Sequence, residues 1–122
     1  MEHKLYDLGN LQEIAQGDEA FVNEMLVIFV ENVTKDIETI RSLQPFEEWK
    51  TIAEIAHKMA TRFAYLSIDS LRTLSVDIEK SILLYNNFTG IAEKTDKLCD
   101  DSILLIERMK KDFEFILFPK YC

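Results

Sequence analysis

The sequence predicts an all-α protein: an antiparallel up-down-up-down four-helix bundle with a short extra helix at the N-terminus. Three observations support this fold class. Apolar residues recur at three- and four-residue spacing through four long stretches. Every glycine and proline falls where a helix would begin or end. The connections between the stretches are short, and long helices joined by short loops pack side by side as a bundle.

The first two predicted helices are separated by a glycine. Asp7 or Asn10 can cap a short helix over residues 11–16. Asp18 then offers a hydrogen-bond acceptor to the free amides of a second helix, which extends to about residue 43. The apolar face of this second helix is formed by Phe21, Val22, Met25, Leu26, Phe29, Val33, Ile37 and Ile40.

The third predicted helix starts near Pro45, whose missing amide is tolerated in a first turn, and runs to Leu66. Its apolar stripe consists of Trp49, Ile52, Ala56, Met59, Phe63 and Leu66. The fourth helix is expected to be capped by Asp69 and to end near Tyr85. Its inner face is predicted to contain Leu71, Leu74, Ile78, Ile82 and Leu83.

The last predicted helix begins near Ile91 and runs to about Phe115. Its inward residues are expected to be Leu98, Leu105, Met109 and Phe113. A chain of 122 residues is one domain by length, so residues 1–122 are predicted to form a single unit. Within it the bundle covers about residues 19–115, and residues 116–122 form a C-terminal tail.

Composition narrows the class of partner. The net charge of −8 argues against a nucleic-acid backbone or an anionic membrane surface. The sequence has no signal-peptide pattern, and its apolar runs are far shorter than a membrane span. Cys99 and Cys122 lack the spacing of a metal or redox motif, which is typical of a reduced protein. We therefore expect a cytoplasmic monomer that binds neither nucleic acid nor membrane.

His57 is the main candidate for chemistry. The chain has two histidines, and His3 lies close to the terminus. On a helical projection, His57 lies roughly 110–120° from the centre of the apolar stripe, at the margin that faces water. The residues expected to surround it on a partner-docking margin are mostly short: Ala53, Lys58, Ala60, Thr61 and Ala64. Such an imidazole is accessible to another protein.

The run from Ala56 to Glu79 resembles the histidine phosphotransfer (HPt) domain of multistep two-component signalling. The matching residues are Ala56-His57, Met59, Leu66-Ser67, Leu71, Ser75, Ile78 and Glu79. Residues 6–8 and 17–21 are similar to the family's N-terminal segment. The sequence departs from the pattern at Ala60, where the family usually has Lys, and at Thr61, where it usually has Gly.

The resemblance implies a phosphocarrier and not an enzyme. His57 would accept and donate the phosphoryl group, and Glu79 would bond the other ring nitrogen and fix the imidazole's orientation. The expected partners are receiver domains of response regulators or of hybrid histidine kinases. The receiver would supply the divalent metal, so no cofactor or metal of this chain's own is expected. Neutral imidazole is a ready nucleophile near pH 7 and needs no base.

Two alternatives compete with this interpretation. Glu54 and His57 have the Glu-x-x-His spacing of a di-iron bundle, but such a site needs a second motif, and no second helical histidine exists. The departures at Ala60 and Thr61 allow a different role: a degenerate HPt-like bundle that acts as a protein-interaction module without phosphotransfer. Nearby Arg62 and Tyr65 are expected to be ordinary surface residues.

Overall fold

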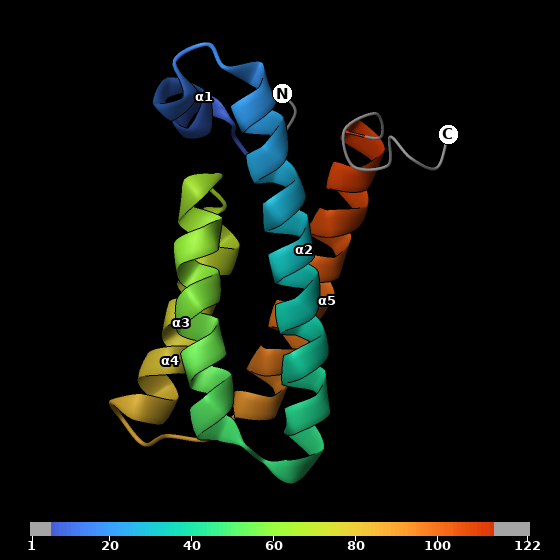
Figure 1. Ribbon diagram of the computed structural model, residues 1–122. Coiled ribbons are helices and arrows are strands. Elements are labelled where there is room, and N and C mark those ends of the chain that lie inside the picture. The colour runs from blue at the N-terminus through green and yellow to red at the C-terminus, as the bar shows by residue number, and fades with distance from the viewer. Residues whose placement is uncertain (1–5, 114–122) are drawn as a thin grey trace, which may run out of the picture.

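The computed structural model describes residues 6–113 of the chain. This part of the chain is all-helical and contains no strand, as predicted. The predictions for His3, Cys122 and the tail 116–122 concern residues outside the described range. The elements, which run from blue to red in Figure 1, are α1 (Gly9–Ala15), α2 (Glu19–Leu43), the 3-10 turn η1 (Gln44–Phe46), α3 (Trp49–Tyr65), α4 (Asp69–Leu83) and α5 (Ile91–Asp112).

The four long helices share one hydrophobic core. α2 packs against α3 and α5, and α4 packs against the same two helices, with the most extensive contact between α3 and α4. Phe29 of α2 meets Phe63 of α3 in the interior, where their ring centroids are 6.2 Å apart. The short helix α1 packs on α2 at the end where α2 begins and α3 ends (Figure 1). Its Leu11 is buried and belongs to the same core.

Two predicted carboxylates serve helix N-termini. Asp18 is the N-cap of α2, and its Oδ1 accepts a hydrogen bond from the amide of Phe21 at 3.1 Å. The first helix, α1, starts two residues earlier than predicted, so Asn10 lies inside it and Leu8, not Asp7, holds the N-cap position. Oδ1 of Asp7 still accepts a hydrogen bond from the amide of Gly9 at 2.7 Å. Both contacts satisfy amides that have no partner within their helix.

Two other predicted helix starts are different in the structure. Pro45 lies in η1 and not in α3, which begins four residues later at Trp49. Asp69 is the first residue of α4 and does not cap it, because Ile68 occupies the N-cap position and no side chain bonds the first amides. The backbone at Ser67 has a φ of 55°, so the chain turns sharply before Asp69 and the helix starts one residue earlier than expected.

Most of the predicted core is buried, which confirms the helical periodicity. The predicted inward residues that are buried include Leu26, Phe29, Val33, Ile37, Ile40, Ile52, Ala56, Met59, Phe63, Leu66, Leu71, Ile78, Ile82, Leu98, Leu105 and Met109. Leu83 was predicted to face inward, and this is wrong, because 48% of its surface is exposed. It lies about 140° around the helix from Ile78, outside the buried stripe of α4.

Within residues 6–113, none of the helices combines the length and the apolar character that a membrane crossing requires.

Candidate functional site

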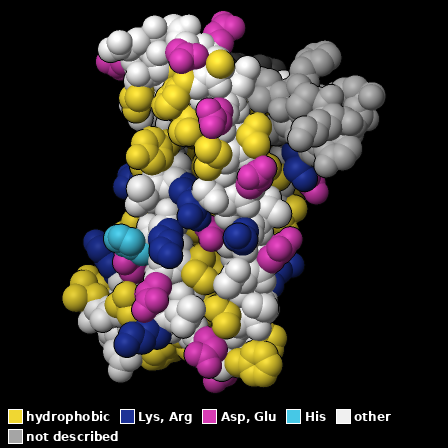
Figure 2. Space-filling model, in the orientation of Figure 1, with side chains coloured by type: hydrophobic (Ala, Val, Ile, Leu, Met, Phe, Trp, Pro, Cys, Tyr) yellow, Lys and Arg dark blue, Asp and Glu magenta, His cyan; other side chains and the backbone are white. Residues whose placement is uncertain are grey.

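α3 buries one face and presents the other to solvent. Ile52, Ala56, Met59 and Phe63 are completely buried on the inner face. His57 lies at the edge of this face, and 66% of its side-chain surface is exposed. Figure 2 shows its imidazole, the cyan group, at the margin of the molecule. The prediction of an exposed histidine is confirmed.

Glu79 of α4 faces this imidazole across the contact between α3 and α4. Its Oε2 lies 2.7 Å from Nδ1 of His57, the distance of a charge-assisted hydrogen bond. An ionised carboxylate can only accept, so Nδ1 is the nitrogen that carries and donates the proton. The Glu79 side chain is 23% exposed, so water competes little for it. The predicted contact between these two residues is confirmed.

The hydrogen bond to Glu79 defines the role of each ring nitrogen. In the neutral imidazole, a proton on Nδ1, where Glu79 can accept it, leaves the lone pair on Nε2. Among the described residues, Glu79 is the one side chain that bonds the ring. The contact with Glu79 favours the tautomer in which the exposed Nε2 carries the lone pair, which suits a nucleophile toward an incoming electrophile.

The short residues predicted near the imidazole divide into two groups. Lys58, Thr61 and Ala64 are exposed, as expected for a docking margin. Ala53 and Ala60 are 0% and 8% exposed, so the prediction that they belong to this margin is wrong. Ala53 lies four residues before His57 and Ala60 lies three residues after it, and both side chains point toward the inside of the fold. Their methyl groups fill space inside the fold and present nothing to a partner.

Neither of the two residues that depart from the HPt pattern offers a strong donor to a group on the ring. The methyl group of Ala60 is buried, and it carries no charge. The hydroxyl of Thr61 is 3.5 Å from the backbone carbonyl of His57, a long hydrogen bond that turns this group toward its own helix. Neither residue supplies a cation for a group attached to Nε2.

The exposed face of α3 is nevertheless locally basic. Lys50 and Lys58 are exposed, and no ion pair to either occurs within residues 6–113. Glu54 is the one carboxylate of α3 on this face. Arg62 is not the ordinary surface residue that was expected, because it forms a partly buried ion pair with Asp36 of α2. Figure 2 shows Lys and Arg side chains beside the histidine.

Other chemistries find little support among the described residues. No group of three or more His, Cys, Asp or Glu side chains there is placed to hold a metal ion. Glu54 is exposed to solvent. Cys99 is completely buried, and burial raises the pKa of its thiol, which makes it a poor nucleophile.

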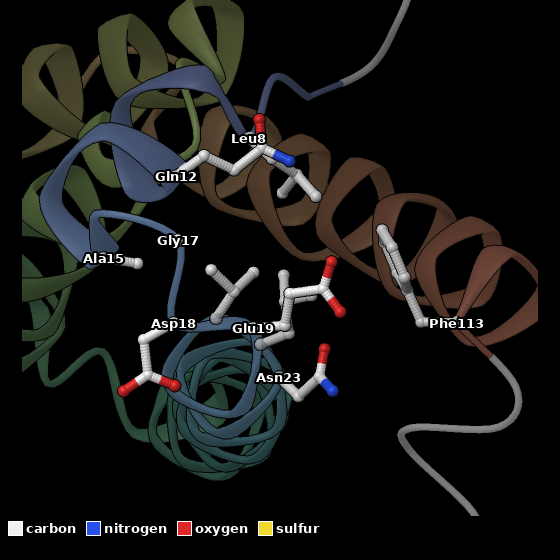
Figure 3. A pocket seen from close by; sticks show the side chains of 10 residues that line it. Leu8, Gln12, Ala15, Gly17, Asp18, Glu19, Asn23 and Phe113 are labelled. Atoms are coloured by element: carbon white, nitrogen blue, oxygen red, sulfur yellow. The ribbon is translucent and has the colours of Figure 1, made fainter.

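A separate hollow of about 440 Å³ lies where α1, the start of α2 and the end of α5 meet (Figure 3). Asp18 at its rim already caps α2. None of its lining residues comes from α3 or α4, so it is distinct from the imidazole site. The lining residues are Leu8, Gln12, Ala15, Gly17, Asp18, Glu19, Val22, Asn23, Leu26 and Phe113.

Comparisons of this chain with protein-family models, with curated proteins and with solved structures found no match. What the site does must be inferred from its own residues.

Proposed function

We propose that this chain is a histidine-containing phosphocarrier of a two-component phosphorelay. His57 accepts a phosphoryl group from the aspartyl phosphate of a receiver domain and donates it to another. One observation carries the proposal: an imidazole with 66% of its side-chain surface exposed has its Nδ1 2.7 Å from Oε2 of Glu79, a contact that favours the tautomer with Nε2 free to attack.

In the transfer, the lone pair of Nε2 forms a bond to phosphorus while the bond from phosphorus to the aspartyl oxygen breaks. The electron pair of the broken bond leaves with the receiver's carboxylate. The ring acquires positive charge, which the carboxylate of Glu79 stabilises at Nδ1–H. The reverse step returns the phosphoryl group to an aspartate by the same path. Positioning and charge neutralisation are the main requirements of such a reaction.

The receiver supplies what this chain lacks. An aspartyl phosphate is a reactive mixed anhydride, held in an acidic pocket with a divalent metal on the receiver. This chain contributes the imidazole and its orientation, and neither a cofactor nor a kinase activity. The partners are receiver domains of response regulators or hybrid histidine kinases. The carrier acts as a cytoplasmic monomer, without nucleic acid or membrane.

The arrangement of the helices suits this role. We propose that the four long helices form an up-down-up-down bundle, since only residues 66–68 separate α3 from α4 and residues 84–90 separate α4 from α5. Connections this short join antiparallel neighbours. α2 also packs on both α3 and α5, as ring closure of such a bundle requires. The imidazole then stands on a rigid helix and not on a loop.

A protein-interaction module without phosphotransfer is the alternative. It is favoured by Ala60 and Thr61, which offer a phosphoryl group neither a cation nor a free hydroxyl. An interaction module does not explain why Glu79 contacts an exposed His57. This contact orients a surface side chain and is not needed to hold the helices together.

The decisive experiment is label transfer. Receiver domains loaded with radioactive phosphate are mixed with the chain, and acid-labile, alkali-stable label is sought on it. The wild type should take up label, and His57→Gln should take up none while its melting temperature stays nearly the same. A surface substitution of this kind changes stability by about 0.5 kcal/mol or less. Label on the Gln variant, or none on the wild type with any receiver, would contradict the proposal.

A further inference from the structure

Leu83 is an exposed leucine at the end of α4 that the core does not explain. It is 48% exposed, although the rest of the predicted inner face of α4 is buried or half-buried. Leu83 follows Glu79 by four residues, so the two share one face of the helix. Side chains on a helix tilt toward its N-terminus, so the isobutyl group of Leu83 leans back toward Glu79.

This geometry brings an apolar group next to the imidazole site. One helical turn, about 6 Å along the axis, separates Leu83 from the carboxylate that holds His57. Figure 2 shows hydrophobic side chains at the molecule's edge, below the cyan histidine. The apolar surface and the nucleophile are therefore open to solvent on the same side.

Any protein that delivers a phosphoryl group to Nε2 must cover this neighbourhood. A specific interface buries about 800 Å² on each partner, which corresponds to a disc with a radius of about 16 Å. A disc of this size centred on His57 includes Leu83. A leucine that is exposed before binding and buried after it contributes the transfer free energy of its buried apolar area to the interface.

The charges of the surrounding surface indicate what kind of partner fits. Lys50 and Lys58 of α3 and Lys80 of α4 are exposed, and no ion pair to any of them occurs between residues 6 and 113. The exposed acidic side chains near them are Glu47, Glu48 and Glu54 around Lys50 and Asp77 beside Lys80, and Asp77 pairs with Lys94, whereas the whole chain carries a net charge of −8. This part of the surface is less acidic than the chain as a whole, and its exposed lysines favour a partner with an acidic face. The phosphoryl pocket of a receiver domain is acidic.

We propose that Leu83 is an apolar docking anchor for the receiver domain that exchanges its phosphoryl group with His57. This inference rests on the proposed phosphocarrier function. Leu83 touches no reacting atom, so it contributes to binding and not to the chemical step. The anchor lies on α4 and the nucleophile on α3, so the receiver spans both helices when it docks.

The test separates docking from chemistry. Receiver domains from the source genome are purified and loaded with acetyl phosphate, and the one that labels the wild type fastest is the probe. Leu83→Ser should raise the KM for this phosphorylated receiver by about 5- to 10-fold, the effect of losing roughly 1 kcal/mol of binding free energy. The kcat should stay within twofold. Leu83→Met keeps an apolar side chain and should restore a KM near that of the wild type.

Two controls complete the design. Leu104→Ser replaces a leucine that is 60% exposed on α5, away from α3, and should leave KM unchanged. Phosphoramidate transfers a phosphoryl group to imidazole without docking, so it should label wild type and Leu83→Ser equally.

An unchanged KM in Leu83→Ser, while wild type is labelled, would overturn the docking anchor and leave the phosphocarrier function intact. Slower labelling by phosphoramidate would show that Leu83 acts on the imidazole itself, which also overturns the anchor. If no receiver labels the wild type, the phosphocarrier function fails and the anchor fails with it.

Discussion

Oε2 of Glu79 and Nδ1 of His57 lie 2.7 Å apart, although they come from different helices and one of them is mostly exposed. α3 provides the access to the imidazole, and α4 provides its orientation. The two requirements of a surface nucleophile, exposure and a defined tautomer, are thus met by separate elements. Their effects can be separated by mutation.

Glu79→Ala should slow phosphoryl transfer by about tenfold and not abolish it. A hydrogen bond to a charged group is worth about 1.5–3 kcal/mol, and part of this acts on the transition state, where the ring becomes positive. The nucleophile itself remains. Single-turnover transfer from a labelled receiver measures the rate.

Glu79→Gln is the matched variant. Its amide oxygen can still accept from Nδ1–H but carries no charge, so its rate should lie between those of Ala and wild type. Equal rates for all three proteins would mean that the contact with His57 does not contribute to transfer.

Ala60→Lys should lengthen the lifetime of the phosphohistidine and shift the transfer equilibrium toward this chain. The expected gain is about 0.5–1 kcal/mol, the value of an exposed charge pair. Because Ala60 is only 8% exposed, the new side chain must bend outward and should also lower the melting temperature. Thr61→Lys places the same charge one residue further on at an exposed position, where no such loss is expected.

If neither lysine variant changes the lifetime, a cation already present serves the phosphoryl group. Lys58 is then the first candidate, because it is exposed beside the histidine. The decay of acid-labile label over time in the isolated phosphoprotein measures the lifetime.

Helical periodicity predicted the helices, most of the core and the exposed His57, and the resemblance to the HPt pattern predicted the contact of His57 with Glu79. Those features depend on the period of a single helix or on a resemblance to a known motif. The burial of Ala53 and Ala60 could not be predicted in this way, because it depends on how α3 packs against its neighbouring helices. The apolar stripe was defined by the large residues of α3. It does not show whether a neighbouring helix also covers the alanines beside the stripe.

Two other features that depend on neighbouring helices were missed for the same reason. Arg62 looks like a surface residue on α3 alone, and its pairing with Asp36 depends on the rotation of α2. Leu83 belongs to the apolar pattern of α4, yet it lies past the region that neighbouring helices cover. The exposure of Leu83 became visible only when all four helices were placed.

Ser75→Ala and Ser102→Ala should each raise the free energy of unfolding, by about 0.5–1 kcal/mol. Both hydroxyls are buried and have no hydrogen-bond partner among the described residues. Burying each hydroxyl therefore costs desolvation free energy, and alanine has no hydroxyl to desolvate. Thr95→Val is the control, since the buried Thr95 hydroxyl donates to the carbonyl of Ile91 at 2.7 Å. That variant should lose stability in urea denaturation, and a loss in the two serine variants would contradict the argument.

Asp36→Ala should lower the free energy of unfolding by about 1–2 kcal/mol. The side chains of Arg62 and Asp36 are only 26% and 15% exposed, so the variant leaves a partly buried guanidinium without its carboxylate. Lys97→Ala breaks the exposed pair with Asp101 and should cost about 0.5 kcal/mol or less. If chemical denaturation shows the same loss of unfolding free energy in Asp36→Ala and Lys97→Ala, burial does not strengthen the Arg62 pair.

Tyr6→Phe should remove a pH-dependent contribution to stability. The Tyr6 hydroxyl donates to Oδ2 of Asp112, next to a tilted contact between Tyr6 and Phe113 with ring centroids 5.6 Å apart. This hydrogen bond lowers the pKa of Asp112. Burial, followed by the bond to Asp112, raises the pKa of Tyr6.

The two shifts define a pH window. A lowered carboxyl pKa stabilises the fold above the ordinary value of about 3.9, and this contribution is lost as the pH falls through the lower folded value. A raised tyrosine pKa stabilises the fold below about 10, and this contribution is lost as the pH rises above that value. The stability difference between wild type and Tyr6→Phe should therefore be largest, about 1 kcal/mol, between roughly pH 5 and 9. It should shrink on both sides in urea denaturation, whereas a constant difference would assign the effect of Tyr6 to packing alone.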